Sequence, residues 1–186
     1  MTFAFIRHGE TDWNRDLRLQ GSTDIPLNDT GRRQAQNAVA VLDGTKWDVV
    51  VSSPLSRARE TAQIIADGLG IELGPSYSEL VERDYGAAEG ATAEIIAENW
   101  PDRQYPGLES LDDVVERGEA ALDRIANDYG KQNVVIVCHG TIIRYTLAAL
   151  AGQPLDPIRN GSTATFDQAA GGWRVHTVND VELTAV

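Results

Sequence analysis

The chain has 186 residues and a mass of 20.2 kDa, a size that favours one compact domain over two. Hydrophobic residues make up 42% and charged residues 24% of the sequence, which is typical of a globular protein and argues against disorder or a fibre. The 16 basic and 28 acidic residues give a net charge of -12, so diffuse attraction to nucleic acid or to an anionic membrane surface is disfavoured.

Cys138 is the only cysteine, which excludes an intramolecular disulfide and a cysteine-based zinc site. The N-terminal residues lack the charged and apolar order of a signal peptide. No apolar run approaches the roughly 20 residues needed to cross a bilayer. We therefore expect a cytoplasmic protein with a single domain over residues 1–186.

Short β-branched or apolar runs alternate with helical patterns along the chain. The predicted strands are residues 2–6, 48–52, 133–138, 162–167 and 173–178. The predicted helices are residues 28–42 with Asn28 as a cap, 53–69 with Ser53 as a cap and Pro54 in the first turn, 111–125, and 142–150. This order predicts an α/β fold, a three-layer αβα sandwich with a mostly parallel, mixed central sheet whose last two strands form an antiparallel edge hairpin. The least regular stretch, rich in glycine and proline, predicts a surface lid within residues 86–110.

Two of the three histidines follow a predicted buried strand directly, and each precedes a glycine. His8 comes after residues 3–7, and His139 comes after residues 134–138. Because ligands of open α/β sheets bind beyond the carboxyl ends of the strands, we expect both imidazoles in one crevice if the strands are neighbours. His176 lies in an alternating segment near the C-terminus and is expected on a half-exposed strand face.

Two arginines predict that this crevice binds an anion. Arg7 stands beside His8, and a fixed cation there disfavours both protonation of the imidazole and binding of a metal cation. Arg57, near the start of a predicted helix, would add a planar fork of donors, and the helix terminus would add backbone N–H groups. Together these groups predict a phosphate pocket that needs no metal.

Four motifs in order carry a resemblance to a known family. They are Arg7-His8-Gly9-Glu10-Thr11 with Asn14 and residues 19–31, Ser52-Ser53-Pro54-Leu55-Ser56-Arg57-Ala58 with Thr61, Leu80-Val81-Glu82 with Gly86 and Glu89-Gly90, and Val137-Cys138-His139-Gly140 with Arg144. This pattern resembles the histidine phosphatase superfamily, the phosphoglycerate-mutase-like proteins, over nearly the whole chain.

The resemblance implies a role for each matching residue. His8 would be the nucleophile that forms a phosphohistidine, which water then hydrolyses. Arg7, Arg57 and His139 would bind the phosphoryl oxygens, and Asn14 would donate a further hydrogen bond. Glu82 would protonate the leaving alkoxide and then activate water. The other interpretation of Glu82 is a surface carboxylate paired with Arg83. The sequence departs from the family pattern at Ala88, which replaces a usual aromatic residue, and this departure puts the shape of the substrate pocket in doubt.

A competing interpretation uses the spacing from Cys138 to Arg144, which fits the Cys, five residues, Arg pattern of cysteine-dependent phosphatases. That chemistry needs a loop whose N–H groups curl inward. Ile142 and Ile143 are bulky and β-branched, so they favour a helix that packs on the sheet. We therefore expect Cys138 to be a buried structural thiol.

The predicted activity is hydrolysis of a small phosphorylated metabolite, with no cofactor and no nucleic-acid or membrane partner. Mutase-type phosphoryl transfer and a non-catalytic phospholigand-binding domain are the alternatives. Transfer is disfavoured because the compact stretch between Glu82 and His139 offers few basic residues among many acids, namely Arg83, Arg103, Arg117, Arg124 and Lys131. Residues 86–110 would contact the group that bears the phosphate. The sequence leaves open the identity of the substrate and the oligomeric state, a homodimer included.

Overall fold

A six-stranded sheet forms the centre of the molecule, in a computed structural model that describes residues 1–169 and 172–184. Its strand order is β3-β2-β4-β1-β5-β6. The strands are β1 Thr2–Arg7, β2 Val49–Ser52, β3 Glu72–Ser76, β4 Val134–Cys138, β5 Thr163–Ala169 and β6 Gly172–Val175. The first four strands in this order are parallel, whereas β5 and β6 are antiparallel to their neighbours. The predicted mixed sheet and edge hairpin are therefore confirmed.

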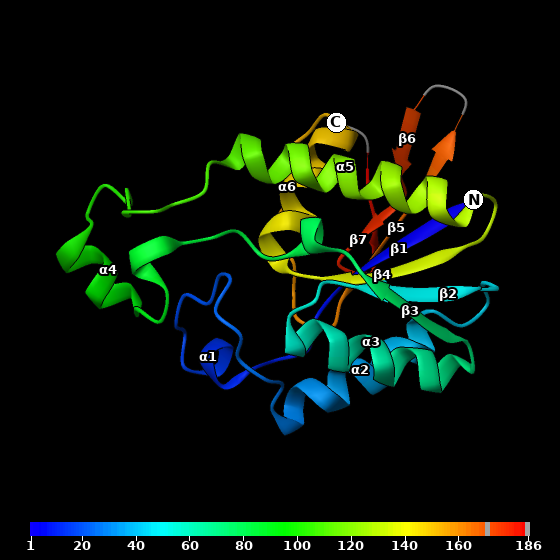
Figure 1. The fold of residues 1–186 in the computed structure, drawn as a ribbon, viewed down its shortest axis with the longest axis horizontal. Coiled ribbons are helices and arrows are strands. Elements are labelled where there is room, and N and C mark those ends of the chain that lie inside the picture. Colours follow the sequence, from blue (N-terminus) through cyan, green and yellow to red (C-terminus); the bar gives the residue numbers. More distant parts are fainter. Residues whose placement is uncertain (170–171, 185–186) are drawn as a thin grey trace.

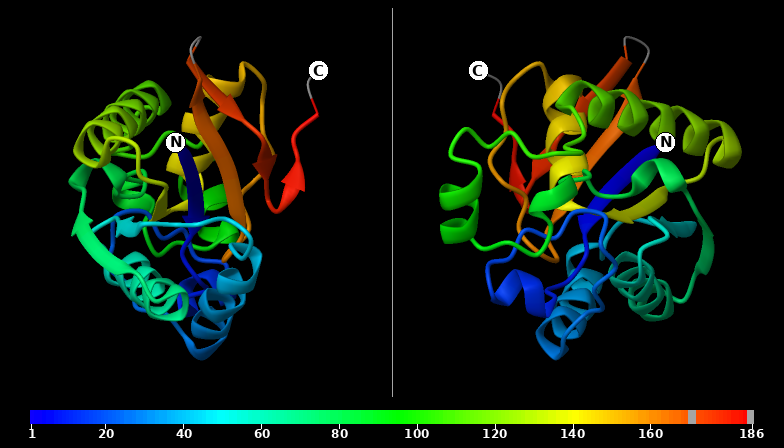
Figure 2. Two further views of the ribbon diagram at one scale, coloured as in Figure 1. Left: turned by 90° about the vertical axis from the view of Figure 1, so that its right-hand side faces the viewer. Right: turned by 60° about the vertical axis from the view of Figure 1, so that its left-hand side comes forward.

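Helices cover both faces of the sheet (Figures 1 and 2). They are α1 Asp12–Arg15, α2 Asp29–Val41, α3 Ser56–Leu69, α4 Ala93–Asn99, α5 Leu111–Tyr129 and α6 Gly140–Ala151, with short 3-10 turns η1 Ser78–Leu80 and η2 Gly86–Ala88. A small hairpin of β7 Thr177–Val178 and β8 Val181–Glu182 follows the sheet. In Figure 1, α5 and α6 lie on one side of the sheet and α2 and α3 on the other. None of the helices in the described ranges is long and apolar enough to span a bilayer.

The alternation of side chains along β1 explains why this strand is central. Phe3 and Phe5 join the core beneath α5 and α6, whereas Ala4 and Ile6 join the core beneath α2 and α3. All four side chains are fully buried. A strand that is apolar on both faces needs helices on both sides, which is why the sandwich has three layers.

Several boundaries differ from the predictions. The helix predicted from Ser53 begins at Ser56, with Leu55 as N-cap, because the Ser53 hydroxyl accepts from the Leu55 N–H and also bonds to His139 instead of capping the helix. The predicted strand 173–178 is divided into β6 and β7. The structure also contains β3, α1 and α4, which the sequence patterns did not indicate. Asn28 does cap α2, since its side chain accepts from the Gly31 N–H.

The carboxyl ends of the parallel strands meet at one end of the molecule, toward the left in Figure 1, with α1 and the start of α6 on this side and α4 farther out. The chain leaves β1 through a tight contact. A Cβ atom on Gly9 would lie 2.2 Å from the carbonyl oxygen of Gly31 in α2, so only glycine fits there. The Gly9 N–H also donates to the Thr61 hydroxyl at 3.1 Å, which fixes the loop just after His8.

Candidate active site

The two histidines predicted to share a crevice do so. Strands β1 and β4 are parallel neighbours in which Arg7 lies opposite Cys138, and the His8 N–H donates to the Cys138 carbonyl at 3.0 Å. His8 and His139, the residues that follow this pair, therefore lie side by side at the carboxyl ends of β1 and β4. The ring centroids of His8 and His139 are 5.1 Å apart, and both rings are buried.

The hydrogen bonds of His8 define a neutral ring. Its Nδ1 lies 2.6 Å from the Gly9 carbonyl oxygen, which can only accept, so Nδ1 carries the hydrogen. Its Nε2 accepts from Arg57 Nε at 3.2 Å. Burial, followed by the charges of Arg57 and Arg7, lowers the pKa of His8 well below its ordinary value. The Nε2 lone pair is therefore retained at neutral pH.

Arg57 is held in place by backbone carbonyls. Its Nη1 donates to Thr23 O at 2.8 Å and its Nη2 to Gly21 O at 2.7 Å, and its side chain is fully buried. Burial lowers the pKa of Arg57 to about 10, so the guanidinium stays charged at neutral pH. The loop that supplies these carbonyls is bound to Glu89, whose carboxylate accepts from the N–H groups of Ser22 and Thr23.

His139 and Arg7 each present a buried nitrogen with no hydrogen-bond partner among the described residues, Nδ1 in His139 and Nε in Arg7. The other ring nitrogen of His139, Nε2, lies 2.8 Å from Ser53 Oγ. Arg7 Nη1 donates to Ile158 O at 2.7 Å. Burial is the main cause that lowers the pKa of both residues, that of His139 well below its ordinary value. A buried polar nitrogen without a partner is costly, and Arg7 Nε, which can only donate, is suited to an anion.

Glu82 is bound to the start of α6. Its Oε2 accepts from the Thr141 N–H at 3.0 Å, and its Oε1 accepts from the N–H groups of Ile142 and Arg83 at 3.3 and 2.8 Å. The interpretation of Glu82 as a surface carboxylate paired with the Arg83 side chain is wrong. Glu82 is only 9% exposed, and Arg83 Nε donates instead to Glu109 O at 2.8 Å.

A partly buried ion pair holds the segment that carries Glu82. Arg117 on α5 donates to both carboxylate oxygens of Glu109, at 2.7 and 3.0 Å. Its Nη1 also donates to the carbonyls of Glu79 and Val81, just before Glu82. No motif indicated this contact, because Arg117 lies in an ordinary helical pattern far along the chain.

Asn14 lines the cavity, and Asn160 holds Asn14 from behind. Asn14 Oδ1 accepts from the Thr11 N–H at 3.2 Å and from Asn160 Nδ2 at 3.3 Å, which leaves the Asn14 Nδ2 as the donor for a ligand. Asn160 Nδ2 also donates to the His8 carbonyl at 3.0 Å. No sequence motif pointed to Asn160. Ser53, which contacts His139, does lie within one of the motifs, although the sequence pattern predicted only a helix cap there.

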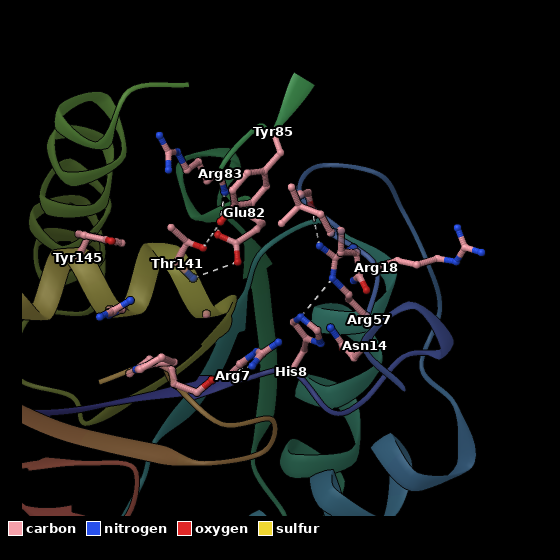
Figure 3. Close-up of a pocket in the computed structure, with 17 residues that line it drawn as sticks. Arg7, His8, Asn14, Arg18, Arg57, Glu82, Arg83, Tyr85, Thr141 and Tyr145 are labelled. Atoms are coloured by element: carbon pink, nitrogen blue, oxygen red, sulfur yellow. Dashed lines mark hydrogen bonds between the residues drawn. The ribbon is translucent and has the colours of Figure 1, made fainter. Parts of the chain in front are cut away.

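The predicted site residues converge on one cavity of about 300 Å³, drawn in Figure 3. Arg7, His8, Asn14, Arg57 and Glu82 line it, and His139 is packed beside His8. The remaining lining residues are Arg18, Leu19, Gln20, Gly21, Arg83, Tyr85, Gly140, Thr141, Arg144, Tyr145, Pro157 and Ile158. Within residues 1–169 and 172–184, no three His, Cys, Asp or Glu side chains lie close enough together to hold a metal ion.

Two expectations about the lining need correction. No residue of 86–110 lines the cavity around His8; residues of that stretch line an adjoining cavity, which shares Leu19, Arg83 and Tyr85 with the first. Ala88, the departure from the family pattern, is buried and lines neither cavity, so it does not shape the pocket directly.

Two other candidates lie away from the chemistry. Cys138 is fully buried within β4, burial raises the pKa of its thiol, and the residues that follow form helix α6 rather than a loop of inward N–H groups. His176 is exposed and its Nε2 lies 2.8 Å from Asp167 Oδ2. Neither residue lines the cavity of Figure 3.

Comparison with known proteins gives the family. The model of the histidine phosphatase superfamily (branch 1) matches residues 3–181. The chain is 37% identical over 182 residues to the uncharacterized phosphatase PhoE of Bacillus subtilis (strain 168), with 95% of this chain and 93% of that protein covered. It is 35% identical to phosphoglycerate mutase-like protein 4 of Arabidopsis thaliana, with 95% and 84% covered.

Solved structures agree with this assignment. The mycobacterial glucosyl-3-phosphoglycerate phosphatase in complex with VO3 matches with a TM-score of 0.87 and 29% identity over 96% of this chain and 98% of that chain. YhfR of Bacillus stearothermophilus matches with a TM-score of 0.88 and 27% identity over 98% of each chain. The chain belongs to the histidine phosphatase superfamily. Within that family it is an enzyme of the phosphatase kind, a phosphoric monoester hydrolase.

Proposed function

We propose that this enzyme hydrolyses a small phosphorylated metabolite through a phosphohistidine intermediate on His8. The observation that supports this most is the setting of His8, whose Nδ1 lies 2.6 Å from the Gly9 carbonyl oxygen and whose Nε2 lies 3.2 Å from Nε of the buried Arg57. A nucleophile must keep its lone pair, and the phosphoryl group needs cations beside it. His8 and Arg57 supply both at one point.

In the first step, His8 Nε2 would attack phosphorus while the bond from phosphorus to the leaving oxygen breaks. Arg7 and Arg57 would bind the phosphoryl oxygens as charge spreads over them. If the Ser53 hydroxyl donates to His139 Nε2, the ring hydrogen of His139 is on Nδ1 and points to a further phosphoryl oxygen. Glu82, as the carboxylic acid, would give its proton to the leaving alkoxide.

In the second step, water would attack the phosphohistidine and the bond from phosphorus to Nε2 would break. Glu82, now a carboxylate, would take a proton from that water, and inorganic phosphate would leave. The residues of the 86–110 stretch that line the adjoining cavity would cover the far end of a longer leaving group and act as the lid.

The test is to trap the intermediate. A 32P-labelled substrate, quenched during turnover, should give a phosphoenzyme that is labile to acid and stable to base. His8→Ala should lose both turnover and label. Cys138→Ala, a control that alters the neighbouring buried residue, should keep both. Label that persists in His8→Ala and disappears in Cys138→Ala would transfer the nucleophile to the thiol.

Hydrolysis is separated from mutase-type transfer by the products. With 3-phosphoglycerate, with and without 2,3-bisphosphoglycerate, the proposal expects inorganic phosphate as the main product and no need for the bisphosphate. Rapid formation of 2-phosphoglycerate with negligible phosphate release would overturn hydrolysis and leave the His8 chemistry intact.

A further inference from the structure

The charge of the cavity is opposite to that of the protein. The whole chain has a net charge of -12, yet the 17 residues that line the cavity include five arginines and a single carboxylate, Glu82. The arginines are Arg7, Arg18, Arg57, Arg83 and Arg144. Of these arginines, only Arg83 belongs to the acid-rich stretch between Glu82 and His139, and the other four come from elsewhere in the chain.

The cavity arginines form no ion pairs among the described residues, whereas five of the nine arginines outside the cavity do. The arginines in ion pairs among the described residues are Arg15, Arg32, Arg117, Arg124 and Arg159, all outside the cavity. No Asp or Glu oxygen of the described residues lies within 4.0 Å of a cavity arginine nitrogen. In a chain with 28 acidic residues, cations gathered without acidic partners on one cavity are suited to an anionic ligand.

The two buried arginines and the two beyond Glu82 serve different parts of that ligand. Arg7 and Arg57 lie beside His8, where the phosphoryl group is transferred. Arg83 follows Glu82 directly in the chain, and Arg144 lies one helical turn after Thr141, whose N–H donates to Glu82. Figure 3 shows Arg83 and Tyr145 on the far side of Glu82 from His8 and Arg57. Since Glu82 would protonate the leaving oxygen, the rest of the leaving group extends toward this side.

Arg83 and Arg144 are held in the same way. Each donates its Nε to a backbone carbonyl, Arg83 to Glu109 O at 2.8 Å and Arg144 to Leu155 O at 2.6 Å. Each guanidinium carbon also lies over a tyrosine ring, 5.5 Å from the centroid of Tyr85 for Arg83 and 5.4 Å from that of Tyr145 for Arg144. These contacts fix the planar groups while the Nη donors remain for a ligand, so little entropy is lost when an anion binds.

We propose that the leaving group of the substrate carries a negative charge of its own, a carboxylate or a second phosphate, and that Arg83 and Arg144 bind it. This inference rests on the phosphatase reaction proposed above and narrows its substrate class to acidic phosphomonoesters. Arg83 and Arg144 are then the residues that determine specificity, with no part in the transfer of the phosphoryl group.

The experiment compares substrates that differ only in the second charge. O-Phosphoserine and O-phosphoethanolamine differ by one carboxylate, and 3-phosphoglycerate and glycerol 3-phosphate replace a carboxylate by a hydroxymethyl group. The acidic member of each pair should have the higher kcat/KM, by about ten- to a hundredfold, as expected for charge-assisted hydrogen bonds. The dissociation constants of the same pairs for His8→Ala, measured by calorimetry, should show the same preference. This measurement does not depend on turnover.

Variants assign the preference to residues. The double variant Arg83→Met, Arg144→Met should reduce the preference to less than about threefold. It should do so by lowering kcat/KM for the acidic substrate, while kcat/KM for the neutral substrate stays nearly unchanged. Arg174→Met, which removes an equal charge from exposed β6 outside this cavity, should keep the preference. The inference would be overturned by equal kcat/KM values for both members of each pair in the wild-type enzyme, or by an equal fall in both values in the double variant. Hydrolysis of p-nitrophenyl phosphate with labelled His8 would still support the proposed function in that case.

Discussion

The phosphoryl end of the cavity and its leaving-group side are built in different ways. At the phosphoryl end, His8, His139 and Arg57 come from the ends of central strands and the first turn of α3, and all three are nearly or fully buried. On the leaving-group side, Arg83, Tyr85 and Arg144 are partly exposed. Helix α4, whose residues line the adjoining cavity, stands out from the sheet in Figure 1.

This difference separates chemistry from selection. The sheet fixes His8 and His139, the groups proposed to act on phosphorus, because parallel strands in register cannot move independently of the core. The leaving-group side is attached through loops and single contacts, so its residues can change without loss of the fold. Changes at the phosphoryl end should therefore affect every substrate, and changes on the other side should affect some substrates more than others.

Arg57→Lys should give the largest effect and tests the first half of the comparison. Lysine keeps the charge but loses the planar fork that bonds two carbonyls and His8 Nε2. We expect kcat/KM to fall roughly a thousandfold for acidic, neutral and aryl phosphates alike. The matched control is Arg59→Lys on the same helix, which bonds Gly74 O and should remain within a few-fold of wild type. A loss that depends on the leaving group would contradict this assignment.

Glu82→Gln should give an effect that depends on the substrate. An alkoxide needs a proton as it leaves, so alkyl phosphates should slow about a hundredfold, and p-nitrophenyl phosphate by less than tenfold. The measurement is kcat for both substrate types. Glu79→Gln, which pairs with Arg124 near the surface, is the control that should change neither. Equal slowing of both types would place Glu82 in binding or in structure.

The pH dependence of stability should give the smallest effect. The native pKa of His8 and of His139 lies well below the ordinary value of 6.5, so below pH 6.5 the unfolded chain binds protons that the native protein does not. The free energy of unfolding should therefore fall as the pH drops from 7 to 5.5, by about 1 kcal/mol for each histidine.

Urea unfolding at several pH values checks this prediction. His8→Asn should lose about half of the histidine-dependent decrease, and His176→Asn, at an exposed position, should retain nearly all of it. A wild-type curve that is flat across this interval, or a His8→Asn curve as steep as that of wild type, would mean that the buried rings titrate normally.

The sequence was sufficient for the inner strands of the sheet and for the phosphoryl end. Apolar strands buried on both faces have a clear pattern, and a motif placed just after such a strand lies at its carboxyl end. That is why Arg7, His8 and His139 could be placed together. The edge strand β3 was missed because Glu72–Ser76 contains Gly74 and Pro75 and is half exposed, so no apolar run marks it.

The leaving-group side could not be predicted in the same way. Arg144 was visible in a motif, but its distance from Glu82 depends on where α6 meets the 82–85 segment. Asn160 and Arg117 reach the site from segments with no motif at all. Contacts between residues far apart in the chain follow from packing, and a single sequence contains no direct record of them.

The attachment of Glu82 to α6 has a consequence for how such an enzyme can be remodelled. Its carboxylate is fixed by the Thr141 and Ile142 amides, on the same helix that His139 caps, and not by residues 86–110. Glu82, the proposed acid, and His139, the proposed phosphoryl ligand, therefore share one rigid support. An exchange of residues 90–107 for another loop should therefore leave the distance between Glu82 and His139 unchanged. The substrate range of the enzyme could then be altered through this loop without altering the groups held by α6.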